Sequence, residues 1–194
     1  MKLVYPEGAT PIDPDEQEGL ILTHITAREE LNRWEQENIH KAEEWCNSRK
    51  HSDILTMGFT LKLHKKMFGD VWKWAGQFRT SLKNIGVQSW QISIELQKLF
   101  DDFNVWLEYG TYSNDEMTVR FHHRLVSIHL FPNGNGRHAR MITNLIQKQI
   151  LNEEEFSWGR TDLSQACDCR KRYIKALIAA DNNDYLPLLK FARS

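Results

Sequence analysis

The sequence has neither an excess of basic residues nor a long apolar run. Its 25 lysines and arginines are balanced by 26 aspartates and glutamates, and the formal net charge of −1 argues against a nucleic-acid-binding protein. No apolar run is long enough to span a membrane, and the N-terminal stretch MKLVYPE stops being apolar too early for a signal peptide. We therefore predict a cytoplasmic protein that has no nucleic-acid or membrane partner.

Cysteine is also scarce, with Cys46, Cys167 and Cys169 as the three residues of this type. An odd and low number fits a reducing compartment rather than a disulfide framework. Cys167 and Cys169 lack the second pair that a zinc site would need, so we interpret all three as structural. The chain of 194 residues fits one domain, or one domain with an extension, and 41% hydrophobic residues suffice for a sizeable core.

One stretch of twelve residues stands at the centre of the chain's organisation. Residues 129–140 have the sequence HLFPNGNGRHAR, between two segments with apolar residues at helical spacing. Pro132 and the glycines end the first helix and allow a tight turn before the second. The N–H groups at the start of the second helix, together with its dipole, favour an anion. Arg137 and Arg140 oppose that dipole but are well placed to hold phosphate oxygens bidentately.

His129 stands just before this predicted anion site, at the end of the first helix. A histidine there can act as a general base, because its pKa lies near working pH. The residues therefore indicate a phosphate site with a base beside it. A dinucleotide site or P-loop is a poor alternative. Gly134-x-Gly136 follows a helix rather than a strand, no third glycine follows at the right spacing, and no Gly-Lys-Ser/Thr is present.

The twelve residues resemble the signature of the Fic family, His-Pro-Phe-x-Asp/Glu-Gly-Asn-Gly-Arg-x-x-Arg, and ten of them fit it. The flanking sequences FHHRLVSI at 121–128 and DYLPLL at 184–189 resemble the Fic subfamily called mobile mystery protein B, over nearly the whole chain. The resemblance implies a nucleotidyltransferase of the Fic-type fold. Such an enzyme moves AMP from ATP to a hydroxyl of a target protein, with Mg²⁺.

The resemblance also implies a role for each matching residue. His129 would deprotonate the attacking hydroxyl, and Phe131 would be a buried anchor. The residues that would cradle the α- and β-phosphates are Gly134, Asn135 and Gly136. Arg137 would bind phosphate, and Arg140 would hold the γ-phosphate.

Two positions depart from the signature. Leu130 replaces a proline, which affects the stiffness of the loop more than its chemistry. Asn133 replaces the acid that usually ligates Mg²⁺, and an amide oxygen can still be a ligand but brings no charge. Two alternatives stay open for this reason: transfer of another phosphate-containing group on the same fold, and a nucleotide-binding module without transfer. His129 argues against the second, because anion binding alone needs no base.

The N-terminal residues 1–25 are rich in proline and acids and are predicted to form an arm packed on the domain, which would comprise residues 26–194. Thr26 and Glu29 have the spacing of a capping box, so we expect a helix over 26–46.

The start of this expected helix is similar to the family's inhibitory pattern, Ser/Thr-x-x-x-Glu-Gly/Asn, except that Leu31 replaces the glycine or asparagine. The resemblance implies that Glu30 pairs with Arg140 and blocks the γ-phosphate position, since a carboxylate can compete with phosphate for a guanidinium. The alternative is an ordinary exposed acid on a helix.

Residues 79–92 lose helical spacing and place β-branched and aromatic residues around an Asn-Ile-Gly centre, which predicts a hairpin or loop. The resemblance implies a flap at which a target protein docks by strand-like pairing, and a hairpin without a partner is the alternative. Family members often act as toxins or regulators beside another protein, which leaves room for an antitoxin or regulatory partner.

Apolar residues at helical spacing predict helices over most of the remaining chain. One is expected within 53–75, one over 94–110, and one that opens at the capping box Ser113–Glu116 and leads to His129. The predicted fold class is therefore all-α, with one short β-hairpin at 79–92.

Overall fold

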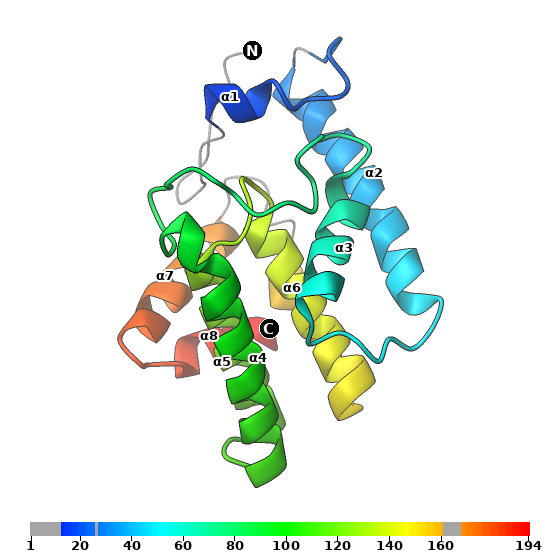
Figure 1. Cartoon of the computed structure of the whole chain (residues 1–194). Helices are drawn as coiled ribbons and strands as arrows, with labels where there is room; N and C mark the ends of the chain where they lie inside the picture. Colours follow the sequence, from blue (N-terminus) through cyan, green and yellow to red (C-terminus); the bar gives the residue numbers. More distant parts are fainter. Residues whose placement is uncertain (1–12, 26, 161–167) are drawn as a thin grey trace.

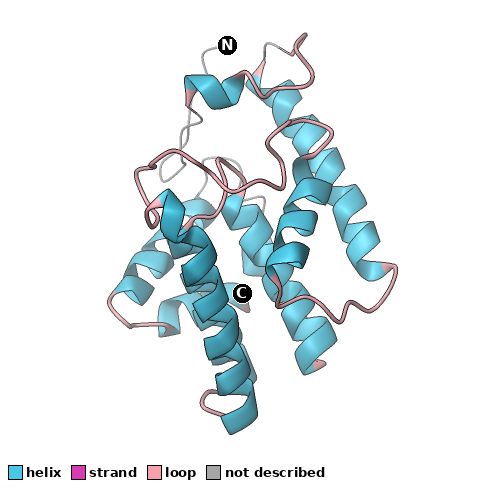
Figure 2. Ribbon diagram, in the orientation of Figure 1, coloured by secondary structure: helices cyan, strands magenta, loops and turns pink. Residues whose placement is uncertain are grey.

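The fold is a bundle of helices joined by loops. The computed structural model describes residues 13–25, 27–160 and 168–194. Its α-helices are α1 (Pro14–Gln17), α2 (Arg28–Asn47), α3 (Met57–Phe68), α4 (Ile92–Tyr109), α5 (Asn114–Ile128), α6 (Asn135–Leu145), α7 (Asp168–Asp181) and α8 (Leu186–Ala192). Shorter helical turns are η1 (Ser89–Gln91), the π-helical η2 (Ile146–Leu151) and η3 (Trp158–Arg160). In the described ranges β-pairing is limited to an isolated bridge between Leu20 and Trp72, and Figure 2 shows helices and loops, which confirms the all-α class.

Helix α6 stands at the centre of the arrangement (Figure 1). It packs against α5 on one side and α3 on the other, while α4 pairs with α5 and α2 pairs with α3. These helices share the larger apolar core, and a smaller one joins α7 and α8 to α5. The turn between α5 and α6 therefore lies at the junction of the helix pairs. No helix in the described part of the chain has both the length and the apolar character needed to cross a membrane.

The helix ends follow the local sequence. Gly110 ends α4 in the left-handed conformation, with φ 59°, as glycine does at many helix ends. Ser113 caps α5 by accepting the N–H of Glu116 at 3.3 Å, as its spacing predicted. Helix α2 begins at Arg28 with Ala27 as its N-cap, and Thr26 lies outside the described residues.

The described part of the predicted N-terminal arm packs on the loop that follows α3. The N–H of Ile21 donates to the carbonyl of Val71 at 2.9 Å, and that of Lys73 donates to Gly19 at 2.8 Å. The indole of Trp74 donates to the carbonyl of Glu16 at 3.0 Å. Residues 1–12 lie outside the described residues, and the division at residue 25 stays a prediction.

The hairpin predicted for residues 79–92 is wrong, because these residues form a loop that ends in η1. The cause is the side chain of Arg79. Its guanidinium donates to the carbonyls of Ser81, at 2.8 Å, and Val87, groups that a two-stranded ladder would pair across the turn. The N–H groups of Arg79 and Val87 donate outward to the carbonyls of Leu130 and Ile128, at 2.9 and 3.3 Å.

Candidate active site

His129 is the residue at which α5 ends. Its φ of 57° and ψ of 68° place it in the left-handed region, which costs a non-glycine residue roughly 1–2 kcal/mol. Burial lowers the pKa of His129 to about 4, helped by the positive charges of Arg79 and Lys83, while the carbonyl of Val126 acts in the opposite direction. The ring is therefore neutral at neutral pH, which is the form that a general base requires.

The turn after His129 is shaped by the side chain of Asn135. Its amide accepts the N–H of Phe131 at 2.9 Å and donates to the carbonyl of the same residue at 2.8 Å. Phe131 is fully buried, as predicted for an anchor, and stacks on His64 with ring centroids 3.6 Å apart. Because Nδ1 of His64 accepts the N–H of Gly76, its Nε2 carries the proton that is donated to the carbonyl of Asn133 at 3.1 Å.

The predicted phosphate cradle forms the start of α6. Gly134 is the N-cap with φ 81°, and a Cβ there would lie 2.6 Å from the ring of Phe68, so the turn requires glycine. A Cβ on Gly136 would meet nothing closer than 3.6 Å, which leaves the backbone open to a ligand. The N–H groups of a first helical turn lack partners inside the helix and favour an anion.

Arg137 connects α6 to α2. Its guanidinium donates to the carboxylate of Glu35 at 2.7 Å and to the amide oxygen of Asn133 at 3.1 Å, and it lies over the ring of Phe68. Glu35 is 2% exposed and also accepts the indole N–H of Trp72 at 2.7 Å. Arg137 is therefore held in place from both sides beside the open start of α6.

Arg140 is directed to Tyr173 of α7, a residue that sequence reasoning missed. Its guanidinium lies 5.6 Å from the centre of the Tyr173 ring, and its charge acts on the hydroxyl of that ring. The same hydroxyl lies 2.8 Å from Nε2 of His122, and Nδ1 of His122 lies 3.3 Å from the hydroxyl of Thr143. Burial lowers the pKa of His122 to about 3, and the charge of Arg140 acts in the same direction. A neutral histidine on α5 thus contacts the tyrosine whose ring lies against Arg140.

A cleft of about 800 Å³ opens beside the two motif arginines and extends between α2 and α6. Its lining includes Arg137, Arg140, Met141, Gln36, Glu43 and Trp158. The volume is in the range of ligand sites in proteins, and two guanidinium groups at one place suit a polyanionic ligand.

Residues 54–147, which contain this turn and both flanking helices, match the model of the Fic/DOC family. The chain carries a Fic/DOC family domain. A protein adenylyltransferase Fic from Nematostella vectensis is 26% identical over 148 residues, which are 72% of this chain and 32% of that protein. Protein adenylyltransferase fic-1 from Caenorhabditis elegans is 26% identical over 158 residues, or 74% of this chain and 27% of that protein. The chain thus spans about a third or less of the length of these curated relatives.

Solved Fic domains share the fold. The N-terminal Fic domain of a putative cell filamentation protein from Bartonella quintana superposes with a TM-score of 0.71 at 17% identity, over 89% of this chain and 84% of that one. BepC from Bartonella tribocorum, solved with bound AMPPNP, gives a TM-score of 0.67 at 18% identity, over 93% and 97% of the chains. At these identities the likeness concerns the fold.

The predicted metal ligand of this Fic domain is Asn133. Its side-chain oxygen faces the guanidinium of Arg137 at 3.1 Å, and a positive charge there opposes a cation. Among the described residues, no group of three or more histidines, cysteines and acids could hold a metal ion. Mg²⁺ usually takes one or two carboxylates together with substrate phosphates. The donor set therefore does not fit a resident Mg²⁺ site, and we assign no chemical step to this ion.

The predicted inhibitory residue Glu30 lies half-buried in the first turn of α2. The carboxylate of α2 that reaches a motif arginine is Glu35, five positions further along, and it bonds Arg137. The pairing of Glu30 with Arg140 stays a prediction.

Proposed function

We propose that the chain is a protein adenylyltransferase, which moves AMP from ATP to a Ser, Thr or Tyr hydroxyl of a target protein. One observation carries the proposal: a buried, neutral His129 ends α5 directly before a helix start that bears Arg137 and Arg140. The names of the two curated relatives support it, and so does the AMPPNP in the BepC structure.

In the proposed reaction His129 takes the proton of the target hydroxyl. The oxygen attacks the α-phosphorus of ATP, the bond from that phosphorus to the β-phosphate oxygen breaks, and pyrophosphate leaves. The backbone at Gly134–Gly136 and the side chain of Arg137 would hold the α- and β-phosphates, and Arg140 would hold the γ-phosphate. A ring with a pKa near 4 is a weak base, but a bound triphosphate adds negative charge and raises that pKa toward working pH. A positioned base contributes ~10²–10⁴ in rate.

We further propose that the target docks on the loop over residues 79–92. This loop exposes three large apolar side chains, Leu82 (65%), Ile85 (45%) and Trp90 (71%), next to the segment that covers His129. Exposed apolar residues gathered on one segment favour a protein partner. Self-inhibition by Glu30, an antitoxin or regulatory partner and a cytoplasmic location stay predictions.

The test is transfer of label from ATP that is radioactive at the α-phosphate to proteins of a cell lysate, with Mg²⁺ in the buffer. The wild type and a Glu30→Gly variant are compared with His129→Ala in each background. His40→Ala removes an exposed histidine from α2 and is the matched control. We expect His129→Ala to bind ATP but to lose transfer at least ~10²-fold, and His40→Ala to keep both.

Three outcomes would contradict the proposal. Label that transfers from the γ-phosphate and not from the α-phosphate would indicate another phosphate-containing group, which the amide at Asn133 leaves open. ATP binding without any protein-bound label would indicate a binding module. Equal loss of ATP binding and transfer in His129→Ala would make this residue structural.

A further inference from the structure

We infer that Arg79 is a positioning residue for His129: its guanidinium holds the backbone at the end of α5 and closes the loop 79–92 against the base. Arg79 lies fifty residues before His129 in the sequence and outside the twelve-residue motif. The inference rests on the proposed function, in which His129 is the base.

Three consecutive carbonyls at the end of α5 accept hydrogen bonds from Arg79. Its Nε donates to His129 at 2.6 Å, its Nη2 to Ile128 at 3.4 Å, and its backbone N–H to Leu130 at 2.9 Å. The last carbonyls of a helix lack partners inside the helix, and a cation there is favoured by the helix dipole. These bonds hold the backbone on both sides of the left-handed His129. Arg79 is 2% exposed, so water does not compete for these hydrogen bonds.

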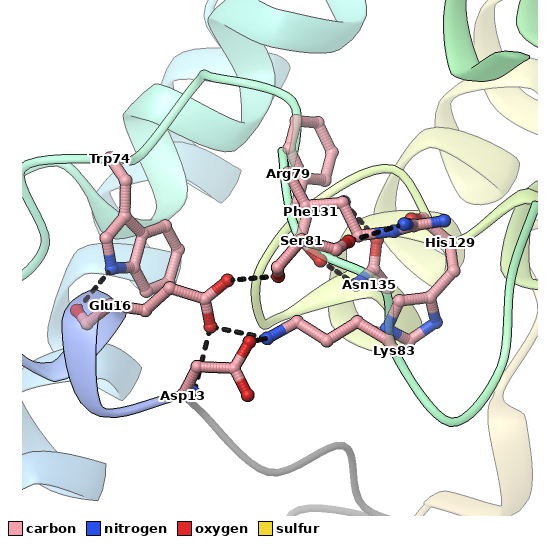
Figure 3. A network of polar contacts seen from close by, with 9 residues as sticks. All are labelled: Asp13, Glu16, Trp74, Arg79, Ser81, Lys83, His129, Phe131 and Asn135. Atoms are coloured by element: carbon pink, nitrogen blue, oxygen red, sulfur yellow. Dashed lines mark hydrogen bonds and ion pairs between the residues drawn. The ribbon is translucent and has the colours of Figure 1, made fainter. Parts of the chain in front are cut away.

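The same guanidinium also bonds two carbonyls within the loop 79–92. It donates to the carbonyls of Ser81 and Val87, so two separate positions of the loop are bonded to the group that holds His129. Gly86, between them, has φ +110°, and a Cβ there would lie 2.7 Å from Nη2 of Arg79 and 2.7 Å from Cβ of His129. The loop therefore contacts the base directly, and its position depends on Arg79. Figure 3 shows the bond from Arg79 to the carbonyl of His129.

Charge gives Arg79 a second effect on the base. Among the described residues, the charged groups that lower the pKa of His129 are Arg79 and Lys83, and the ammonium of Lys83 is balanced by Asp13 and Glu16 at 2.7 and 2.5 Å. In the described part of the chain, the hydrogen bonds of Arg79 lead to neutral carbonyls, and Glu16 acts on it through its charge. After burial, the charge of Arg79 is the larger cause of the lowered pKa of His129. Removing it should therefore make the ring easier to protonate.

The experiment compares Arg79→Met, Arg79→Lys and Gly86→Ala with the wild type. The pKa of His129 is followed by NMR of ring-labelled histidine, with His129→Asn used to identify its signal. Label transfer is measured as a function of pH. Arg124→Met, which removes a partly exposed arginine of α5 that bonds Asp102, is the matched control.

We expect Arg79→Met to raise the pKa of His129 and the acid limb of the rate profile by roughly one pH unit, and to lower transfer at pH 7 by ~10². Arg79→Lys should keep the acid limb of the rate profile, because the positive charge remains. It should lose transfer, because an ammonium cannot make the several hydrogen bonds that the planar guanidinium makes. Gly86→Ala should lose transfer with the pKa kept, because it disturbs the contact and not the charge. Arg124→Met should change neither.

The inference is overturned if the acid limb and the pKa of His129 in Arg79→Met equal those of the wild type, with transfer reduced only in proportion to folded protein. If Arg79→Met does not fold, Arg79→Lys and Gly86→Ala decide, and unchanged transfer in both overturns the inference. A wild type that transfers no label would remove the proposed function, but the titration of His129 would still report on Arg79.

Discussion

At the scale of single residues, two glutamates of α2 stand near the phosphate site in different environments. Glu35 is 2% exposed and holds both the indole of Trp72 and the guanidinium of Arg137. Removing one partner of a buried ion pair typically costs about 3–5 kcal/mol, so Glu35 serves the fold as well as the site. Glu30 is half-buried, so replacing it does not leave a charge without its partner in the core. Glu30 is therefore the glutamate whose removal can report on inhibition.

We predict that Glu30→Gly raises the affinity for ATP roughly tenfold, because a charge-assisted bond to a guanidinium is worth about 1.5–3 kcal/mol and 1.4 kcal/mol is a factor of ten. Isothermal titration with a non-hydrolysable ATP analogue measures the change. Glu29→Gly, at the exposed neighbouring position, controls for the effect of glycine on the helix. Equal affinities in the wild type and Glu30→Gly would exclude competition between Glu30 and ATP.

At the scale of elements, α1 and its N-cap Asp13 hold the loop 79–92 in addition to the bonds of Arg79. The ammonium of Lys83 donates to the carboxylates of Asp13 and Glu16, and its side chain is 2% exposed. The hydroxyl of Ser81 donates to Glu16 at 3.0 Å. Figure 3 shows the ammonium between the two carboxylates. The loop that covers the base is thus bonded to α1 through Ser81 and Lys83 and to the end of α5 through Arg79.

We predict that Lys83→Met loosens this loop without unfolding the domain. Hydrogen exchange of the amides of residues 79–87 should become about tenfold faster, as the loss of about 1.4 kcal/mol of local stability requires. The double variant Asp13→Asn, Glu16→Gln should have the same effect, because it removes the same ion pairs. Lys98→Met, at an exposed lysine of α4 that bonds Glu95, is the control. Unchanged exchange at residues 79–87 in both variants would show that α1 does not hold the loop.

Elements whose ends depend on nearby residues could be predicted from the sequence. Gly110 and Ser113 mark the end of α4 and the start of α5 because each acts on its own turn. The turn at 129–134 follows from its proline and glycines, and the burial of Phe131 follows from the resemblance.

Features that depend on distant contacts could not be predicted in this way. The loop at 79–92 has the composition of a hairpin, but the bonds of Arg79 with Ser81, Val87 and residues 128–130 occupy groups that a hairpin would pair. The contact of the Arg140 guanidinium with the ring of Tyr173 joins α6 to α7, and the sequence near either residue gives no sign of it. For Glu35 a signal was present, because it lies four positions after the buried Leu31 and so shares the buried side of α2.

At the scale of the whole molecule, six of the eight histidines are buried, and four of these have a lowered pKa: His64, His122, His129 and His138. Burial lowers the pKa of each one, to about 3 for His122, to about 4 for His129 and His138, and well below the usual range for His64. The unfolded chain binds protons on these rings below pH 6.5, while the folded protein keeps them neutral until about pH 4. Stability is therefore complete above pH 6.5 and is lost as the pH falls toward 4.

We predict that the free energy of unfolding falls between pH 7 and pH 5, by about 1.4 kcal/mol per pH unit for each such histidine below pH 6.5. Urea unfolding at several pH values measures this slope. His138→Gln should reduce the slope by the share of one histidine, since its ring bonds the carbonyl of Thr60 at 3.1 Å and a glutamine amide can replace that donor. His40→Gln, at a ring that is 68% exposed beside Glu43 and Glu44, is the control. A free energy of unfolding that is constant from pH 7 to pH 5 would mean that the buried rings take up protons as readily in the folded protein as in the unfolded chain. His129 would then lose its neutral form in the same range, and the rate of transfer would decrease at pH values below 6.5.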